Sequence, residues 1–355
     1  MCHNLKCYLM EYILHMNRKR LIALIILPTI LFIICISVFA SNFKNIGIMA
    51  FSKEVNQTRE LKDQYVFEKS WGSEGVAKGQ FKIPHSLAVD IFGNVYVTDT
   101  GNNRVEKFSS NGTLRKQWGS QGTGDGQFNQ LHDIAVDPSG NFVYTVELAN
   151  HRIQKFFNNG TFITKWGFND TGGAGADRKP HQLAVDHLGD VFLTDRAGSE
   201  VLRFNDNGKF LERWGTNGSG SKQFIKPHGI AIDATDHLYI TDMGNSRVQI
   251  FSNNGTFVKK WGTYGTSNGQ FSDGIPGIAV DSKGFIYVVD RLQSRIQKFD
   301  DTGKLIAIWG SKGSSLGELN KPEDIGINDK TGEVFVTDTK NSRIQVFDLK
   351  AKILN

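Results

Sequence analysis

The sequence has little cysteine, little proline and no strong excess of charge. Its three cysteines, Cys2, Cys7 and Cys35, all lie in the first 40 of 355 residues, and the rest of the chain contains none. The residues after position 40 therefore contain neither a disulfide nor a thiolate metal site. Only 7 prolines accompany 38 glycines, and 39% of the residues are hydrophobic, which excludes a disordered chain and is typical of a globular β protein.

Basic charge is concentrated at the N-terminus. The formal net charge is +5, and residues 1–20 supply +3 of it through four basic residues set against Glu11. Subtracting that share leaves about +2 on the rest of the chain, which is too little for the electrostatic footprint of a nucleic-acid-binding surface. We therefore expect no nucleic-acid partner.

A long apolar run occupies residues 21–40, LIALIILPTILFIICISVFA. Twenty such residues form a helix of about 30 Å, which matches the bilayer core. A basic triplet at 18–20 precedes the run, so the positive-inside rule predicts a cytoplasmic segment 1–20 and an external body. We expect a single-pass membrane anchor. The alternative is a cleaved signal peptide and a secreted body, because residues 38–40 resemble a cleavage site.

Several kinds of residue recur through the body at a fixed period. All six tryptophans are followed by glycine and lie 47 or 48 residues apart: Trp71, Trp118, Trp166, Trp214, Trp261 and Trp309. An acidic residue ends a run such as VYVTD in every copy, and an arginine follows five residues later, except that Glu200 replaces it in the third copy. We expect this pair to form a repeated ion pair or turn cap.

Each copy contains four strand-like runs separated by turn signals such as Asn111-Gly112. Four antiparallel strands in each of six repeats predict an all-β, six-bladed β-propeller. Residues 65–71 form a lone fourth strand before the first copy, and the last copy ends after its third strand near residue 347. We expect residues 65–71 to complete the sixth blade and close the ring. The expected organisation is a cytoplasmic segment 1–20, an anchor or signal peptide 21–40, a stalk 41–64, a propeller 65–347 and a tail 348–355.

The repeat units PHSLAVDIFGNVYVTDTGNNRVEKF and PHGIAIDATDHLYITDMGNSRVQIF resemble NHL repeats. The resemblance extends over residues 65–347 and implies a closed propeller. It implies no single function, because propellers serve binding proteins and enzymes alike.

Histidine recurs at one position of the repeat, five residues before the aspartate of IAVD: His85, His132, His181 and His228. The last two copies carry Pro276 and Glu323 there. Because the first strand of each propeller blade lines the channel, we expect the four histidines and Glu323 to converge at one channel mouth. Imidazoles and a carboxylate can hold Zn²⁺, and His132, His228 and Glu323 have the composition of a two-His-one-carboxylate triad. The alternative is a structural histidine that is hydrogen-bonded to the backbone of the next blade.

The segments PHSLAVD, PHQLAVD and PHGIAID are similar to those of the peptidyl-hydroxyglycine α-amidating lyases. These are six-bladed propellers whose histidines hold a channel zinc while a tyrosine and an arginine do the chemistry. The resemblance implies a place at the channel mouth for Arg196 and Arg291, which each follow the aspartate that ends a second strand. The tyrosine expected in the loop after the second strand is missing.

The sequence favours a membrane-tethered, extracytoplasmic propeller that binds an unidentified protein or small-molecule ligand on the face bearing the channel mouth. The alternative is a metal-dependent lyase or hydrolase, with zinc held by the histidine ring. A binding role is favoured over an enzymatic one because a complete catalytic set is missing. The glycine-rich segments connect strands and do not open helices as phosphate loops do, and no nucleophile elbow with supporting partners is present.

Overall fold

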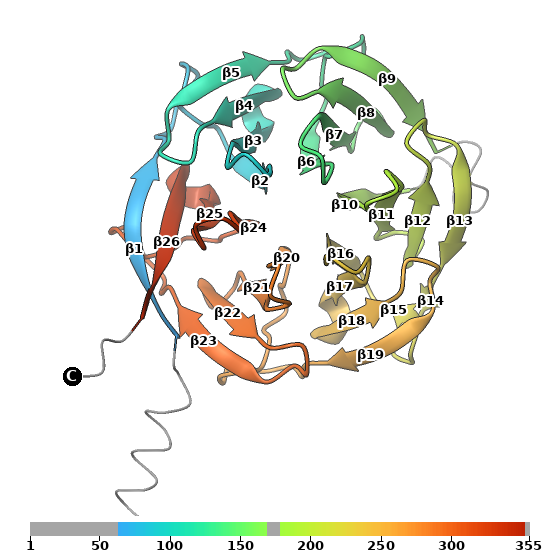
Figure 1. Cartoon of the computed structure of the whole chain (residues 1–355), viewed down its shortest axis with the longest axis vertical. Helices are drawn as coiled ribbons and strands as arrows, with labels where there is room; N and C mark the ends of the chain where they lie inside the picture. Colours follow the sequence, from blue (N-terminus) through green and yellow to red (C-terminus); the bar gives the residue numbers. More distant parts are fainter. Residues whose placement is uncertain (1–62, 169–177, 352–355) are drawn as a thin grey trace, which may run out of the picture. The chain divides into compact units, whose positions relative to one another are not determined.

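Each repeat folds into one four-stranded antiparallel sheet, and six such sheets surround a central axis in the computed structural model of the chain (Figure 1). The structure describes residues 63–168 and 178–351. In five sheets the strands run from the axis outward in chain order, and in the sixth sheet the first strand of the chain is outermost. The strands are rich in β-branched and aromatic residues. The predicted six-bladed β-propeller is confirmed.

The strands of the first three blades, listed from the axis outward, have these bounds. Blade 1 comprises β2 (Pro84–Val89), β3 (Val95–Asp99), β4 (Arg104–Phe108) and β5 (Leu114–Trp118). Blade 2 comprises β6 (Leu131–Val136), β7 (Phe142–Glu147), β8 (Arg152–Phe157) and β9 (Phe162–Gly167). Blade 3 comprises β10 (Pro180–Val185), β11 (Val191–Asp195), β12 (Glu200–Phe204) and β13 (Phe210–Trp214).

The remaining three blades follow the same order. Blade 4 comprises β16 (Pro227–Ile232), β17 (Leu238–Asp242), β18 (Arg247–Phe251) and β19 (Phe257–Trp261). Blade 5 comprises β20 (Ile278–Val280), β21 (Ile286–Asp290), β22 (Arg295–Phe299) and β23 (Leu305–Trp309). Blade 6 comprises β24 (Ile325–Ile327), β25 (Val334–Asp338), β26 (Arg343–Ala351) and β1 (Asp63–Trp71). A short parallel pair, β14 (Thr216–Asn217) and β15 (Gln223–Phe224), precedes blade 4, and 3-10 turns η1 (Thr100–Asn102), η4 (Met243–Asn245) and η5 (Thr339–Asn341) follow three second strands.

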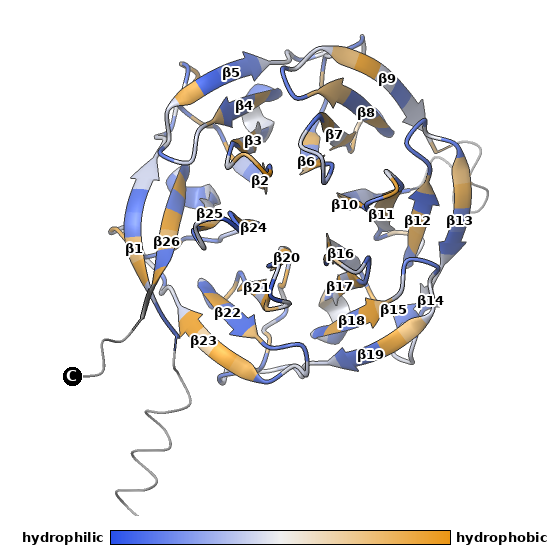
Figure 2. Ribbon diagram, in the orientation of Figure 1, coloured by the Kyte–Doolittle hydropathy of each residue, from blue (hydrophilic) through white to orange (hydrophobic). Residues whose placement is uncertain are grey.

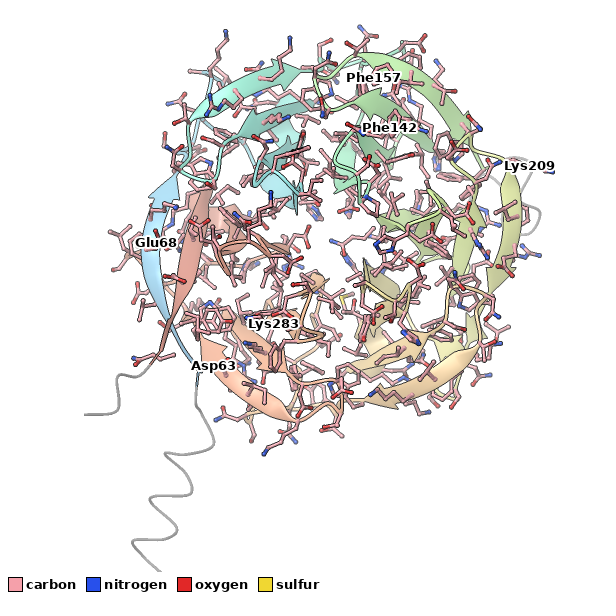
Figure 3. The ribbon with its side chains drawn as sticks, in the orientation of Figure 1. Asp63, Glu68, Phe142, Phe157, Lys209 and Lys283 are labelled. Carbon is pink, nitrogen blue, oxygen red and sulfur yellow. The ribbon has the colours of Figure 1, made fainter. Side chains whose placement is uncertain are left out.

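The first strand of the chain closes the ring. β1 pairs antiparallel with β26, from Asp63 opposite Ala351 to Trp71 opposite Ile344. The ring of Tyr65 stacks on Trp309 of blade 5 at 4.1 Å, and its hydroxyl lies 2.9 Å from that of Tyr287. The closure by residues 65–71 is therefore as predicted. The strand begins two residues before its predicted start, and β26 ends four residues after position 347, because the two strands extend each other's pairing. Figure 3 labels Asp63 at the start of β1.

The predicted segments 1–20 and 21–40, and all but the last two residues of the stalk 41–64, lie outside the described residues. Within residues 63–168 and 178–351, no helix is long and apolar enough to cross a membrane.

Hydrophobic side chains fill the space between neighbouring blades. Each cluster joins two adjacent sheets, as where Phe335 and Ile344 of blade 6 pack with Leu87 and Val97 of blade 1. Along the outer strands β13 and β19, buried or half-buried residues alternate with exposed ones, and Figure 2 shows each strand hydrophobic at its start and hydrophilic toward its end. One face of each outer strand packs inward and the other meets solvent, which produces this alternation.

Two series of recurring glycines lie against aromatic rings. Gly72 follows Trp71 with φ +96°, and a Cβ there would lie 2.4 Å from the ring of the buried Phe81. Gly112 of the Asn-Gly hairpin has φ +83°, and a Cβ there would lie 2.9 Å from the indole of Trp71. The glycine of Asn-Gly in one blade therefore lies against the tryptophan of the preceding blade, whereas the glycine after the tryptophan lies against a buried phenylalanine.

The acidic residue and the arginine of the repeat form the predicted ion pair. In blade 1, Nε of Arg104 donates to Oδ2 of Asp99 at 2.7 Å, and the guanidinium also donates to the carbonyls of Val76, Ala77 and Gln80. These carbonyls belong to the loop that enters the blade. The same ion pair, at 2.5 to 2.9 Å, joins Glu147 to Arg152, Asp242 to Arg247, Asp290 to Arg295, and Asp338 to Arg343.

In blade 3, the cation that pairs with the acidic residue of the repeat comes from another place in the sequence. Glu200 stands at the position of the arginine, and Nη1 of Arg178 lies 2.6 Å from both Oδ2 of Asp195 and Oε1 of Glu200. The Arg178 side chain is completely buried. It precedes β10 and lies outside the periodic pattern, so the repeat alone gave no reason to expect it there.

Arg178→Ala tests this exchange. The substitution leaves the buried Asp195 without its cation and Glu200 with only Arg213, whose Nε lies 3.7 Å from Oε2 of Glu200. We expect it to lower the free energy of unfolding by about 3–5 kcal/mol. Glu200→Arg in the same chain restores the arginine that five blades have, so the double variant should recover most of the loss. Urea unfolding of the three proteins measures this, and three equal midpoints would contradict the account.

Candidate functional site

Each histidine lies at a break in strand pairing. In blade 1, the pairing of β2 with β3 passes from Pro84–Asp99 to Leu87–Val97, so that His85 and Ser86 oppose one residue, Thr98. Oγ1 of Thr98 accepts a hydrogen bond from the Ser86 N–H at 2.8 Å and donates to the Ser86 carbonyl at 3.2 Å. β6, β10 and β16 have a register break at the same place. Such bulges redirect side chains, and here the breaks coincide with the histidines.

The breaks bring three predicted residues into one group. The ligand nitrogens of His132, His181 and His228 all lie within 4.8 Å of one another, and the three residues are buried. The ring of His85 lies beside this group, 4.0 Å from that of His132. Side chains of the inner strands reach toward the centre of the ring in Figure 3. The group therefore comes from three consecutive blades.

Backbone contacts orient two of these imidazoles. Nδ1 of His132 lies 3.1 Å from the carbonyl of His181, and Nδ1 of His228 lies 3.0 Å from the carbonyl of Pro276. A carbonyl only accepts, so we assign the ring proton to Nδ1, which leaves Nε2 with its lone pair. His132 and His228 therefore make the contacts to the backbone of the next blade that the structural alternative expects. The same contacts also prepare Nε2 as a ligand, because a metal-bound histidine usually donates its other N–H in this way.

The histidines are neutral at neutral pH. Burial lowers the pKa of His132 to about 4 and that of His181 to about 2, and the neighbouring imidazoles and Arg196 add to the effect at His181. Burial also holds the pKa of His85 and of His228 well below the usual range. Metal ions bind the neutral form, so these shifts favour binding.

Glu323 occupies the histidine position of blade 6 but stands outside the group. Its Oε1 lies 2.8 Å from Nε of Arg291. Burial raises the pKa of Glu323 to about 7, against the lowering effect of Arg291. The triad of His132, His228 and Glu323 expected from alternate blades is therefore not the group that forms among the described residues.

Arg196 and Arg291, for which the resemblance to the lyases implies a place at the channel mouth, directly follow the second strands β11 and β21. The N–H of Arg196 donates to the carbonyl of Lys179 at 3.0 Å, and that of Arg291 donates to the carbonyl of Gly274 at 2.9 Å. Both acceptors precede an inner strand. The charge of Arg196 lowers the pKa of His132, and the charge of Arg291 lowers that of His85.

A second polar layer follows the histidines and was not predicted. Oδ2 of Asp324 accepts hydrogen bonds from the Ser86 hydroxyl at 2.7 Å and from the Leu87 N–H at 3.2 Å, and Oδ2 of Asp133 accepts one from the Leu183 N–H at 2.8 Å. Burial raises the pKa of Asp324 to about 6 and that of Asp133 well above its usual range, and the charge of Asp324 raises the pKa of Asp133 further.

Asp133 and Asp324 line a cavity of about 190 Å³ among the inner strands. They directly follow His132 and Glu323 in the sequence. Alternation along a regular strand points consecutive residues to opposite faces, so only the histidine position was expected to face the channel. The bulge sends the next residue there too, and an acid directly after the repeated position was the available signal.

The donor set fits a zinc ion. Zinc takes imidazole nitrogens at 2.0–2.1 Å, which places the ligands of a tetrahedral site about 3.4 Å apart. The three histidines offer nitrogens within 4.8 Å of one another, so rotation of the side chains has to bring them closer by up to about 1.4 Å. Neutral imidazoles and oriented Nδ1 groups supply the chemistry that such a site needs.

Fold and site together define a class: a six-bladed β-propeller with buried histidines gathered at one mouth of its channel. The NHL repeat family matches residues 81–108, 128–156, 224–251 and 319–347, which lie in blades 1, 2, 4 and 6. The chain is therefore a six-bladed propeller in which four blades contain NHL repeats. No curated protein matches the chain by sequence.

Solved structures with the same fold include enzymes. Virginiamycin B lyase from Staphylococcus aureus is 14% identical, with a TM-score of 0.55 over 81% of this chain and 100% of that chain. A gluconolactonase from Xanthomonas campestris is 14% identical, with a TM-score of 0.57 over 81% and 100%. A protein of unknown function from Bacteroides thetaiotaomicron is 16% identical, with a TM-score of 0.62 over 81% and 76%. At these identities the likeness shows the fold alone.

His132→Asn tests the state of the cluster. The pKa of His132 is about 4 in the folded protein and about 6.5 without burial. Between these values the unfolded chain binds a proton that the folded chain does not, so stability falls as the pH falls, by about 3 kcal/mol from this group. Asparagine keeps an N–H donor and does not titrate.

The wild type should therefore lose about 3 kcal/mol more than His132→Asn between pH 7 and pH 4. Urea unfolding of both proteins at the two pH values measures the difference. If that difference does not change with pH, His132 is not a buried neutral imidazole.

Proposed function

We propose that this protein is a ligand-binding propeller that holds a zinc ion through His132, His181 and His228 at the mouth of its channel. The observation that carries the proposal is the gathering of three neutral imidazoles within 4.8 Å, with two of their Nδ1 atoms on backbone carbonyls. Three protein ligands leave a fourth position of a tetrahedral ion open, as in zinc sites that bind water or a substrate. Zinc held by these three histidines would supply a Lewis acid that polarises an oxygen of the ligand.

The residues near the histidine group differ in burial and in charge. Toward the channel interior, Asp133, Asp324 and Ser86 are buried. Arg196 and Arg291 are partly exposed, and their charges lower the pKa of His132 and of His85. A ligand would therefore approach from the mouth, and the residues there would orient it.

The metal proposal predicts the metal content of variants. The full-length protein, purified without a metal-binding tag and incubated with zinc, should contain about one zinc per chain by elemental analysis. Alanine at His132, His181 or His228 should lower the zinc affinity at least tenfold, because two ligands do not complete the site. His85→Ala is the matched control, since it has the same place in the repeat but lies outside the group.

A His85→Ala protein that loses zinc as strongly as His181→Ala would contradict the three-histidine assignment. Wild-type protein that takes up no zinc would overturn the metal proposal itself and leave the histidines structural.

A second candidate function is a zinc-dependent lyase or hydrolase. Glu323 favours it, because a carboxyl with a pKa of about 7 can exchange a proton near neutral pH, and Arg291 lies beside it. Virginiamycin B lyase and gluconolactonase share the fold. Turnover by the zinc-loaded protein that is lost in Glu323→Gln, with zinc retained, would favour this candidate over binding alone.

We also propose that residues 21–40 tether the propeller to the membrane with its body outside, and that secretion after cleavage is the alternative. The apolar run and the basic triplet before it support this location. Ser221 is an exposed site for a test, because the body has no cysteine.

The topology prediction concerns Ser221→Cys in a chain whose three native cysteines are replaced by serine. A membrane-impermeant maleimide should label this variant in intact cells, or in spheroplasts where an outer membrane intervenes. A chain with serine at Cys35 only keeps Cys2 and Cys7, and it should be labelled only after lysis. The reverse pattern would contradict the proposed orientation.

A further inference from the structure

Blade 1 carries a buried acid where most blades carry a neutral amide. Glu106 stands two residues after the arginine of the repeat, and blade 3 has Leu202 at that position. The other four blades have a glutamine there: Gln154, Gln249, Gln297 and Gln345. Glu106 lies in β4 and is completely buried. A buried carboxyl of this kind needs either a partner for its charge or a proton.

The glutamines use both ends of their amide. In blade 2, Oε1 of Gln154 accepts a hydrogen bond from the Gly126 N–H at 2.9 Å. Its Nε2 donates to the carbonyl of Gln127 at 2.8 Å and to Oε1 of Glu147 at 2.9 Å. The same three contacts recur in blades 4, 5 and 6. The glutamine therefore joins the loop that enters the blade to the acidic residue that ends the second strand.

Glu106 makes the accepting half of these contacts. Its Oε1 accepts a hydrogen bond from the Gly79 N–H at 3.1 Å, as the glutamine oxygens do. Its Oε2 stands in place of the amide nitrogen, is buried, and has no hydrogen-bond partner among the residues that the structure describes. The groups that the amide nitrogen reaches in the other blades, a carbonyl and a carboxylate oxygen, only accept. A carboxyl fits this place when Oε2 carries a proton and donates.

Glu106 also shares its cation. Nη2 of Arg104 lies 3.4 Å from Oε1 of Glu106, and Nε of Arg104 lies 2.7 Å from Oδ2 of Asp99. Burial raises the pKa of both carboxyls. Asp99 accepts hydrogen bonds from the Lys82 N–H, Asn102 and Arg104 at 2.6 to 2.7 Å, and these donors stabilise its charge. One guanidinium cannot neutralise two carboxylates, so the proton belongs on Glu106.

The other neighbours of Glu106 add no second cation within the described part of the chain. Its partner residue on β5 is the uncharged Gln117. Three charged residues of the entering loop are exposed: Glu74, Lys78 and Lys82. Burial is the main cause that raises the pKa of Glu106, and the charge of Asp99 adds to it, against the lowering effects of the Gly79 N–H and Arg104.

We infer that Glu106 is protonated in the folded protein, and that its proton holds the loop of residues 72–83, which is released when the proton is lost. Ionised Glu106 would present an acceptor to the carbonyl and carboxylate oxygens that the glutamines bind in other blades. This loop leads into β2, the strand that carries His85. The inference concerns the response of blade 1 to pH and does not depend on the proposed metal site.

The test of the proton compares the wild type with Glu106→Gln, which supplies the amide that four blades have. The ordinary pKa of a glutamate is 4.5, and that of Glu106 in the folded protein is higher. Between these values the folded protein holds a proton that the unfolded chain has lost, so wild-type stability falls as the pH rises. Urea unfolding of the two full-length proteins should give similar unfolding constants at pH 5. At pH 9 the wild-type constant should be roughly 10- to 100-fold larger, the effect of a buried polar group without its partner.

Hydrogen exchange locates the effect in the loop. Residues 119–130 form the matching loop of blade 2 and are the internal control, because Gln154 does not titrate. Between pH 6 and pH 9, exchange in residues 72–83 of the wild type should accelerate about tenfold more than exchange in residues 119–130. Glu106→Gln should remove this difference. Gln154→Glu should transfer the acceleration to residues 119–130.

Two results would overturn the protonation of Glu106. One is the same pH dependence of stability in the wild type and in Glu106→Gln, and the other is a variant that is less stable than the wild type at both pH values. A difference in stability at pH 9 without faster exchange in residues 72–83 would overturn the release of the loop.

Discussion

Every blade depends on a buried contact between a cation and the acidic residue that ends its second strand. The arginine of the pair donates its other N–H groups to carbonyls of the loop that arrives from the preceding blade. In five blades, the second carboxylate oxygen accepts a hydrogen bond from a backbone N–H of the same loop. These N–H groups belong to Lys82, Asn129, Lys179, Ile225 and Asn320. Buried charges are tolerated only when they are paired and fully hydrogen-bonded. Blade 3 shows how strictly this holds, because Arg178 supplies the guanidinium where Glu200 has displaced the arginine of the repeat.

The same contact sets the geometry of the channel mouth. Each of the backbone groups it fixes lies two or three residues before the histidine position, so the start of the inner strand is held at a constant place. The threonine of the second strand then stabilises the bulge at which the chain turns His85 and Ser86 toward the axis. Six such positions converge by symmetry, and the residues found there decide what the channel mouth can bind. The repeat therefore supplies six equivalent positions around the axis, and the residue type at these positions differs between blades.

Periodicity made much of this predictable. The number of blades, the closing strand, the repeated ion pair and the convergence of the histidines all follow from residues that recur every 47 or 48 positions. What breaks the period was not predictable. Arg178 enters blade 3 from outside the pattern, Arg291 takes Glu323 away from the histidines, and the bulge aims Asp133 as well as His132 at the axis. These features depend on local side-chain contacts, which the spacing of residues does not record.

The central claim is that three imidazoles, and no carboxylate, hold a metal ion at the mouth of this propeller. X-ray absorption at the zinc K-edge of the zinc-loaded full-length protein tests it most directly, because imidazole rings give outer-shell scattering that carboxylates lack. The account predicts three imidazole ligands at about 2.0 Å, with light atoms completing the shell. A spectrum with two or fewer imidazoles would contradict it and would return the histidines to a purely structural role.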